Sequence, residues 1–394
     1  MKLALCYLFS VVAITMANEF SRELKNGNDQ FTARMFSEVV KSKPEQSVVL
    51  SAYSVLTPLA QLSLASVGES HDELLKAIGM PNDNVTKSAF TQAESSLKSV
   101  KGIELKTASK VYVAKKFELN DEFAVTTRSV FNSEVKNIDF TQSQKTAQEI
   151  NTWVEDQTNK KIKDLVSPDS LDDNTRAVLV NAIYFKGLWK SPFNSDATNE
   201  EEFHVTKEKS IKVPMMYQKS TFKYAELPEF NAKILQMFYE GEEASLIIVL
   251  PDEIDGITQL EEKLKDPAAL DRAISKMYST EVEVSIPKFK IETTTNLKDV
   301  LSKMNVRKLF TPGQARLNNL LKGEADLFIS EAIQKAFIEV NEEGAEAAAA
   351  NAFLPAVASI PFNEPPRIIF DADRPFYFEI RANSIPLFSG IKFD

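Results

Sequence analysis

A run of small residues near the C-terminal end constrains this 394-residue chain more than any other feature. The run is Glu342-Glu343-Gly344-Ala345-Glu346-Ala347-Ala348-Ala349-Ala350, with an alternating apolar segment before it and a β-rich segment after it. Four consecutive alanines are compatible with a short helix or a low-complexity link. The period-two alternation favours a strand, because Ala345, Ala347 and Ala349 would then share one face. A strand with a methyl-only face can enter an existing sheet without overpacking it.

The stretches around this run match one protein family. Ala336–Gly344 leads into it, and Asp373–Phe378 follows it. Together they resemble the hinge region of inhibitory serpins, whose exposed reactive-centre loop inserts into the protein's own central sheet after a protease cuts it. The resemblance covers residues 18–394. It implies an α+β serpin fold, a single domain with a bundle of helices, three β-sheets and a reactive-centre loop at about 342–366.

The N-terminal residues have the pattern of a secretory signal peptide. Lys2 is followed by the apolar run Leu3–Ile14 and then by the small residue Ala17. The apolar run is too short to cross a membrane as a helix. We therefore expect residues 1–17 to be removed and the serpin domain, residues 18–394, to be secreted and extracellular, with no membrane partner.

Cysteine use and charge narrow the class of protein further. Cys6 is the only cysteine and lies inside the predicted signal peptide, so the core must be stable without disulfides. The net charge of −10 argues against nucleic acid as a main partner. Four lysines are locally dense, which fits a solvated face better than a polyanion site: Lys98, Lys101, Lys106 and Lys110. We expect a monomer.

The sequence offers no support for catalysis. It has no Gly-x-Ser-x-Gly elbow, and its two histidines, His71 and His204, stand in no recognisable nucleophile context. Two distant histidines and no mature cysteine make no convincing zinc site. A phosphate-binding glycine loop is also missing. We expect a protein that is not an enzyme and uses no cofactor and no metal.

The apolar pattern predicts helices early and strands late, which suits one α+β domain. Ser51–Val67 reads as a buried helix, and Thr146–Val166 as a long amphipathic helix. Val178–Gly187 reads as a strand buried on both faces, with the polar Asn181 inside it. Glu281–Ile291 reads as one further strand.

The resemblance assigns roles to several of these residues. It places Ser51, Ser54, Asn181 and Gln334 in the shutter beneath the central sheet, and Trp189 and Lys288 at the breach, where insertion starts. Gln334 stands where the family often has histidine, so we expect a rewired hydrogen-bond network. From the residues alone, Ser51 or Ser54 as a helix cap and Asn181 as a satisfied buried amide explain the pattern equally well. The hinge residue Glu342 could pair with Lys288 or Lys290.

One glycosylation acceptor is present. Asn84-Val85-Thr86 has the required pattern, and the neighbouring Asn82 and Asp83 suggest an exposed loop.

The resemblance also implies which bond is offered to a protease. Inhibitory serpins usually place the residue before the cut bond seventeenth from the hinge glutamate, and counting from Glu342 gives Ala358. The bait bond is therefore Ala358–Ser359, and alanine suits the small primary pocket of an elastase-like protease. Val357–Ala358 would select a similar protease. Phe353–Leu354 would suit a chymotrypsin-like enzyme but lies too near the hinge.

The function implied is suicide inhibition of a serine protease of elastase-like specificity, in which the acyl-enzyme is trapped by loop insertion. The alternative is a non-inhibitory serpin that acts as a carrier or storage protein. Such a protein is expected to have a bulky, charged or proline-bearing hinge, and residues 345–350 carry no bulky side chain or proline.

Overall fold

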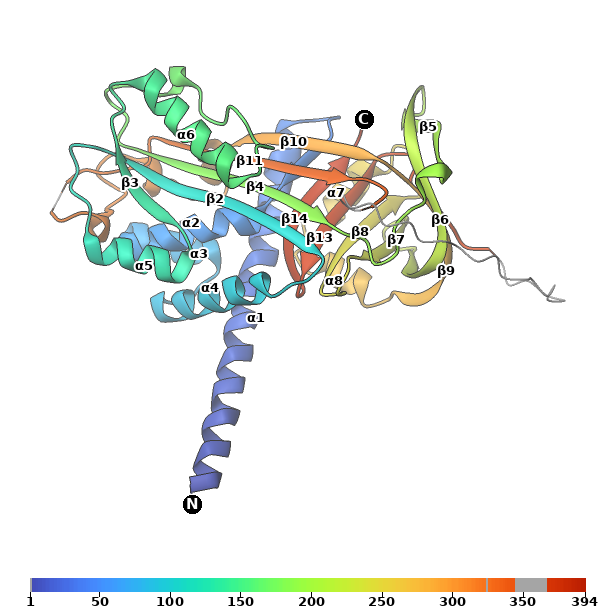
Figure 1. Ribbon diagram of the computed structural model, residues 1–394, viewed down its shortest axis with the longest axis horizontal. Coiled ribbons are helices and arrows are strands. Elements are labelled where there is room, and N and C mark those ends of the chain that lie inside the picture. The colour runs from blue at the N-terminus through green and yellow to red at the C-terminus, as the bar shows by residue number, and fades with distance from the viewer. Residues whose placement is uncertain (1, 324, 344–366) are drawn as a thin grey trace.

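The computed structural model describes residues 2–323, 325–343 and 367–394, with side chains from residue 22 onward. Helices gather on one side of two sheets, and a single helix lies across the other face of the smaller sheet (Figure 1). The helices are α1 (Lys2–Ser42), α2 (Ala52–Ala65), α3 (Glu69–Ile78), α4 (Asp83–Lys98), α5 (Asp121–Phe131), α6 (Ser143–Gln157), α7 (Ile257–Lys263), α8 (Ala269–Ile274) and α9 (Leu297–Lys303).

The strands form a five-stranded and a nine-stranded sheet within these residues. The smaller sheet has the order β10 (Phe289–Asn296), β11 (Glu331–Val340), β4 (Ala177–Gly187), β2 (Ile103–Ala114) and β3 (Glu134–Ile138). The larger has the order β1 (Val48–Leu50), β14 (Ile385–Lys392), β13 (Phe376–Ala382), β8 (Ala244–Pro251), β7 (Ala232–Phe238), β6 (Lys209–Leu227), β9 (Tyr278–Pro287) and β12 (Ile369–Asp371), with β5 (Thr198–Thr206) paired to β6.

The single α+β domain expected from the sequence is what the structure shows, and the three expected sheets are joined into two hydrogen-bonded networks. The reason is the length of β6, which has 19 residues. Its first part pairs with β5, its middle with β9 and its end with β7. One continuous strand therefore belongs to two sheet regions that the resemblance counts separately.

The five-stranded sheet holds one parallel pair at its centre. β4 and β11 run parallel, from Glu331 opposite Val178 to Ile338 opposite Phe185, and antiparallel neighbours flank the pair. The two faces of the sheet are covered by different helices. Asn181 faces α2, whereas Tyr112 on β2 faces Trp153 of α6. The parallel pair is therefore enclosed on both sides.

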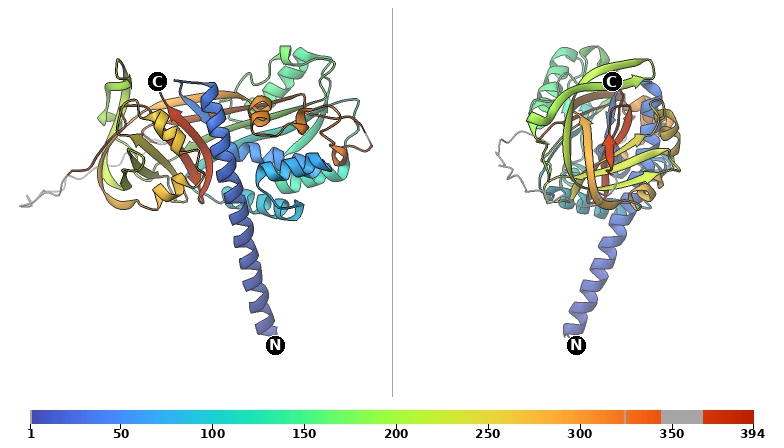
Figure 2. Two further views of the ribbon diagram at one scale, coloured as in Figure 1. Left: turned by 180° about the vertical axis from the view of Figure 1, so that it is seen from behind. Right: turned by 90° about the vertical axis from the view of Figure 1, so that its right-hand side faces the viewer.

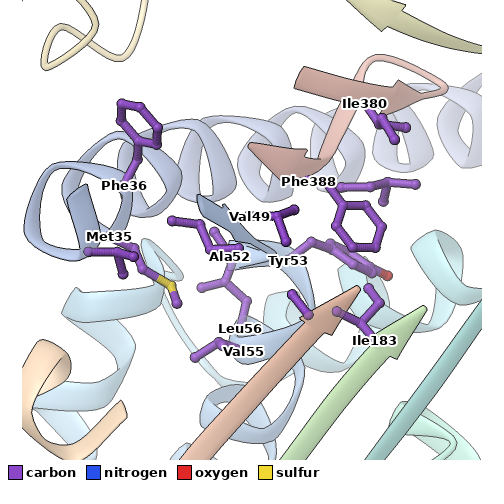
Figure 3. Close-up of a cluster of buried hydrophobic side chains, with 14 of the residues drawn as sticks. Met35, Phe36, Val49, Ala52, Tyr53, Val55, Leu56, Ile183, Ile380 and Phe388 are labelled. Atoms are coloured by element: carbon purple, nitrogen blue, oxygen red, sulfur yellow. The ribbon is translucent and has the colours of Figure 1, made fainter. Parts of the chain in front are cut away.

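The buried helix predicted at 51–67 is α2, and every residue from Ala52 to Ala65 is buried. Ser51 caps it, because its side chain accepts a hydrogen bond from the backbone N–H of Ser54. Figure 3 shows Tyr53 beside Phe388 of β14, with Ile183 of β4 on the other side of the same cluster. This helix therefore joins the cores of both sheets.

The helix predicted at 146–166 ends earlier than the apolar pattern indicates. α6 stops at Gln157, and Asn159 and Lys160 have φ values of 51° and 58°, which a helix cannot contain. Ile162 and Leu165 are nevertheless buried. Their periodicity therefore reports burial of an irregular segment and not a continuing helix.

Two smaller expectations are also corrected. Glu281–Ile291 is not one strand, because β9 ends at Pro287 and β10 begins at Phe289 in the other sheet. Pro287 has no N–H to continue a ladder. Asn84 is exposed, as an acceptor requires, but it lies in the first turn of α4 and not in a loop, because the Asn82 side chain caps that helix.

The N-terminal part of α1 stands away from the rest of the molecule, as both the front and the back views show (Figures 1 and 2). Among the described residues, no helix combines the length and the apolar character needed to cross a lipid bilayer.

One glycine in the core tests the tight contact between β1, β14 and β13. A Cβ on Gly390 would lie 2.4 Å from the backbone oxygen of Val48 and 2.4 Å from the Phe378 ring. We expect Gly390→Ala to lower the free energy of unfolding by about 1–3 kcal/mol, as overpacked cores do. Gly323→Ala is the control, because nothing lies within 4 Å of its added methyl group. Equal thermal or urea unfolding curves for both variants would contradict this packing.

Candidate functional site

The four residues predicted for the shutter meet beneath the parallel pair. The Asn181 side-chain oxygen accepts hydrogen bonds from the Ser54 hydroxyl at 2.8 Å and from the Gln334 amide at 2.9 Å. The Asn181 amide donates to the backbone oxygen of Ser54 at 2.8 Å. All three side chains are buried. β4 and β11 are therefore tied to each other and to α2 through one polar network.

Gln334 completes this network in the place where the family often has histidine. Its amide nitrogen donates to the backbone oxygen of Ser51 at 2.8 Å, and its oxygen accepts from the backbone N–H of Ser51 at 3.3 Å. A glutamine side chain can donate and accept at once, which suits this position. Ser51 therefore caps α2 and also takes part in the shutter network.

The breach closes the parallel pair at the end where β4 and β11 finish. The Trp189 backbone N–H donates to the backbone oxygen of Glu343 at 3.1 Å. The Phe193 backbone N–H donates to the backbone oxygen of Glu342 at 2.8 Å. The Trp189 indole N–H donates to the Asn341 oxygen at 2.9 Å. The Trp189 ring stacks on Tyr239, with ring centroids 4.5 Å apart. The first residues after β11 are therefore hydrogen-bonded to the segment that holds the stacked Trp189 ring.

The Glu342 carboxylate makes two further contacts at the breach. Lys288 lies 2.9 Å from it, and the Thr198 hydroxyl donates to it at 3.0 Å. Partial burial alone would raise the pKa of Glu342, but these hydrogen bonds and a backbone N–H hold that pKa below its ordinary value. Lys290, the other partner considered, pairs instead with Glu339 at 3.0 Å. The hinge glutamate is therefore paired with Lys288.

A strap formed by α6 and the return segment, residues 143–166, lies over the outer face of the sheet (Figure 1). On one side, the Lys110 ammonium of β2 sits 4.0 Å from the centre of the Trp153 ring and 2.9 Å from Glu134. On the other side, Lys335 of β11 donates to the backbone oxygen of Lys163 at 2.7 Å. The strap is thus fastened to β2 and to β11, on either side of the line between β4 and β11.

Sequence reasoning missed three of these contacts. Thr198 and Phe193 touch the hinge from the segment after β4, and nothing in their local sequence indicates it. Lys335 follows the buried Gln334 directly in β11, so alternation would have placed it on the outer face. The predicted hinge residues 344–350 and the bait bond Ala358–Ser359 lie outside the described residues.

The histidines do not form a catalytic arrangement. His204 Nδ1 lies 2.8 Å from the Ser210 hydroxyl in an exposed hairpin, and its Nε2 is 3.9 Å from Asp373. That second distance is too long for the orienting hydrogen bond of a Ser-His-Asp triad. His71 Nδ1 contacts the backbone oxygen of Ser63. Over the described parts of the chain, no three acidic, histidine or cysteine side chains are grouped to hold a metal.

Comparisons with known proteins agree with this geometry. The sequence model of the family described as serpin (serine protease inhibitor) matches residues 26–393. Alaserpin of Manduca sexta is 59% identical over 392 residues, which cover 99% of each chain. Antitrypsin of Bombyx mori is 55% identical over the same length and coverage. The crystal structure of Serpin48 from Tenebrio molitor has a TM-score of 0.86 and 33% identity, covering 95% of this chain and 98% of that one. This chain belongs to the serpin family of serine protease inhibitors.

Proposed function

We propose that this chain is a secreted suicide inhibitor with elastase-like specificity, which offers Ala358–Ser359 as bait and traps the acyl-enzyme by inserting the cut loop between β4 and β11. The observation that carries the proposal is the central parallel pair, which has a closed breach at one end and a run of small residues directly after it.

The pairing of β4 and β11 leaves a favourable place for one more strand. A segment that turns back at the hinge runs antiparallel to both neighbours. It replaces one parallel ladder by two antiparallel ladders, so about one new backbone hydrogen bond is gained per inserted residue. With ten residues in β11, and on the order of 1 kcal/mol net for each bond, insertion gains roughly 10 kcal/mol. That is enough to distort a bound enzyme.

The length of the turn sets which inserted side chains face the core. A two-residue turn at Glu342 and Glu343 pairs Ala345 with Val340 and, six residues later, Asn351 with Gln334. Directly opposite residues share a face, and both Val340 and Gln334 are buried. The alanines at 345, 347 and 349 would then pack inward, and the Asn351 amide would meet the shutter network.

The chemical steps follow from the bait bond. The protease serine attacks the carbonyl carbon of Ala358, the bond to Ser359 breaks, and the Ser359 amine leaves with a proton from the protease histidine. The freed end then inserts and carries the acylated protease with it. Hydrolysis of the ester needs an intact catalytic site, so distortion of the protease stops the reaction at the acyl-enzyme.

The choice of an elastase-like target rests on Ala358 and not on overall identity. Bombyx antitrypsin is 55% identical to this chain, yet its name refers to trypsin. A methyl side chain gains nothing from the acidic pocket with which trypsin binds lysine or arginine, whereas a shallow apolar pocket fits it. Secretion rests on the signal pattern of residues 1–17.

The first prediction concerns the bait bond itself. Mixing the protein, residues 18–394, with an elastase should give a complex that survives denaturing electrophoresis and a released peptide that begins at Ser359. Mass spectrometry of that peptide identifies the bond. A complex with another peptide would move the bond, and complete cleavage without a complex would favour a carrier or storage protein.

The second prediction concerns the small residue that enters the sheet first. Ala345→Arg would bury an unpaired charge opposite Val340, which costs several kcal/mol in an apolar site. Insertion should therefore slow while cleavage continues, so the variant is turned over as a substrate. Titration of elastase activity gives the number of inhibitor molecules consumed per enzyme. A value equal to that of the unmodified protein would contradict the role of Ala345.

The third prediction concerns the restraint on the hinge. Lys288→Gln removes the ion pair with Glu342, whereas Lys290→Gln removes a pair of similar length with Glu339 and serves as control. Only the first should weaken the hydrogen bonds from Trp189 and Phe193, by up to about 1 kcal/mol for a partly exposed pair. Hydrogen exchange of the 189–193 amides measures this. The pKa of Glu342 is lowered, so its charged form stabilises these hydrogen bonds. Lowering the pH until Glu342 is protonated should therefore weaken them as Lys288→Gln does. Equal exchange in both variants would contradict the restraint.

A further inference from the structure

Two large apolar side chains are exposed on the outer face of β6, β9 and β12. Tyr217 of β6 is 39% exposed, and Ile369 of β12 is 53% exposed. The opposite face of the same strands is packed into the core, because Met216, Val284 and Phe370 are fully buried. Single exposed apolar residues are common on proteins, but two that share one sheet face can form part of a contact surface.

Strand register places these two side chains in neighbouring rows of that face. Tyr217 is opposite Ser285 of β9, which is opposite Asp371 of β12. Ile369 is opposite Glu283, in the row two residues away. Directly opposite residues share a face, so two strand spacings and one two-residue step, about 12 Å in all, separate Tyr217 from Ile369. One partner protein can therefore contact both side chains.

Ion pairs lie beside the two apolar side chains on the same face. Lys219 lies 2.8 Å from Glu281 and 4.0 Å from Glu283. The Arg367 guanidinium lies 4.0 Å from the Glu283 carboxylate. These charges largely neutralise one another, so the face presents two apolar groups bordered by paired polar groups. Protein interfaces commonly have an apolar centre with a polar rim.

Both ends of the loop segment lie at the edges of this sheet region. β5, β6 and β9 lie together at one end of the molecule (Figure 1). At one edge, Thr198 of β5 donates to the hinge Glu342 at 3.0 Å and is itself opposite Met216 of β6. At the other edge, the chain runs from Arg367 into β12. A protein that binds residues 344–366 is therefore brought next to this face.

We propose that the outer face of β6, β9 and β12 is a second contact site for the target protease, with Tyr217 and Ile369 as its apolar anchors; this rests on the inhibitory function proposed above. The partner is a serine protease with an apolar surface beside its active-site cleft. The face thereby distinguishes between proteases whose primary pockets accept Ala358 equally well.

The size of a protease domain supports this occupant. Ala358 is nine residues before Arg367, so even an extended chain places the bait carbonyl at most about 30 Å from the edge of the face. A globular domain of roughly 200–250 residues has a radius of gyration of about 17 Å. An enzyme whose cleft holds Ala358 is thus wide enough for its surface to reach Tyr217 and Ile369.

Attachment at two points makes a weak contact effective. While the protease cleft holds the loop, contact with the face is intramolecular, and short connections give effective concentrations in the millimolar range. A patch of this size would form only a transient interface by itself. Combined with the loop, it slows dissociation of the first, noncovalent complex and leaves acylation more time to occur. The rate of inhibition therefore rises, whereas loop insertion is unaffected.

Two exposed tyrosines give a matched test. Tyr278 of β9 is 53% exposed, but it lies seven residues from Ser285, and alternation directs it to the other face. An elastase whose catalytic serine is replaced by alanine cannot form the ester, so its dissociation constant measures docking alone. Tyr217→Ala should raise that constant about fivefold or more, as loss of an interface anchor does, and Tyr278→Ala should leave it unchanged. Ile369→Ser and the remote Val125→Ser, in α5, form a second pair with the same expectation. Equal constants within either pair would overturn the proposal.

Active elastase separates docking from trapping. Tyr217→Ala should lower the second-order rate constant of inhibition by a similar factor and leave the number of inhibitor molecules consumed per enzyme unchanged. A larger number consumed would place Tyr217 in insertion and overturn its docking role. A dimer of the unmodified protein that Tyr217→Ala dissociates would assign the face to a second copy of this chain, which would also overturn the proposal. Absence of any complex with the unmodified protein would instead refute the proposed function, so the two failures are distinguishable.

Discussion

The structure depends on the parallel contact between β4 and β11. This contact can be exchanged for a better one, because two antiparallel ladders are available to a strand that enters between them. The surroundings of the pair fit that exchange. α2 lies below it, the strap lies above it, and the breach closes one end. Each of these contacts the line along which a new strand would pass.

The shutter explains how the closed arrangement would persist although the proposed insertion gains energy. Opening the pair breaks the buried hydrogen bond from Gln334 to Asn181, a loss of about 0.5–1.5 kcal/mol. The breach adds its backbone hydrogen bonds and the ion pair of Glu342. In the proposed insertion the breach contacts break first, and the bond from Gln334 to Asn181 breaks when the entering strand reaches Gln334, so both add to the barrier. In the proposed insertion, Asn351 would replace the lost partner, so the same polar network that resists opening would accept the inserted strand.

Sequence patterns predicted the parts of the fold that depend on burial, and missed those that depend on where distant segments meet. The largely apolar run at 178–187 and the buried helix after Ser51 were found because burial leaves a local pattern. The end of α6 at Gln157 was missed because buried residues continue beyond it. Thr198 at the hinge gave no signal, since a lone threonine carries no trace of a partner 144 positions away. The shutter was predicted as a group only through the family resemblance.

In the proposed insertion, one count of residues connects the hinge and the shutter. Neighbouring strand residues point to opposite faces, so a slip of one residue would turn Glu346 toward α2 and Asn351 away from the shutter. A buried carboxylate without a partner and an unsatisfied amide network would both result. The single acidic and single amide side chains among residues 345–351 therefore favour one register. In the proposed insertion, that register would also bring Pro355 to the end of β11, where the ladder stops and the missing N–H costs nothing.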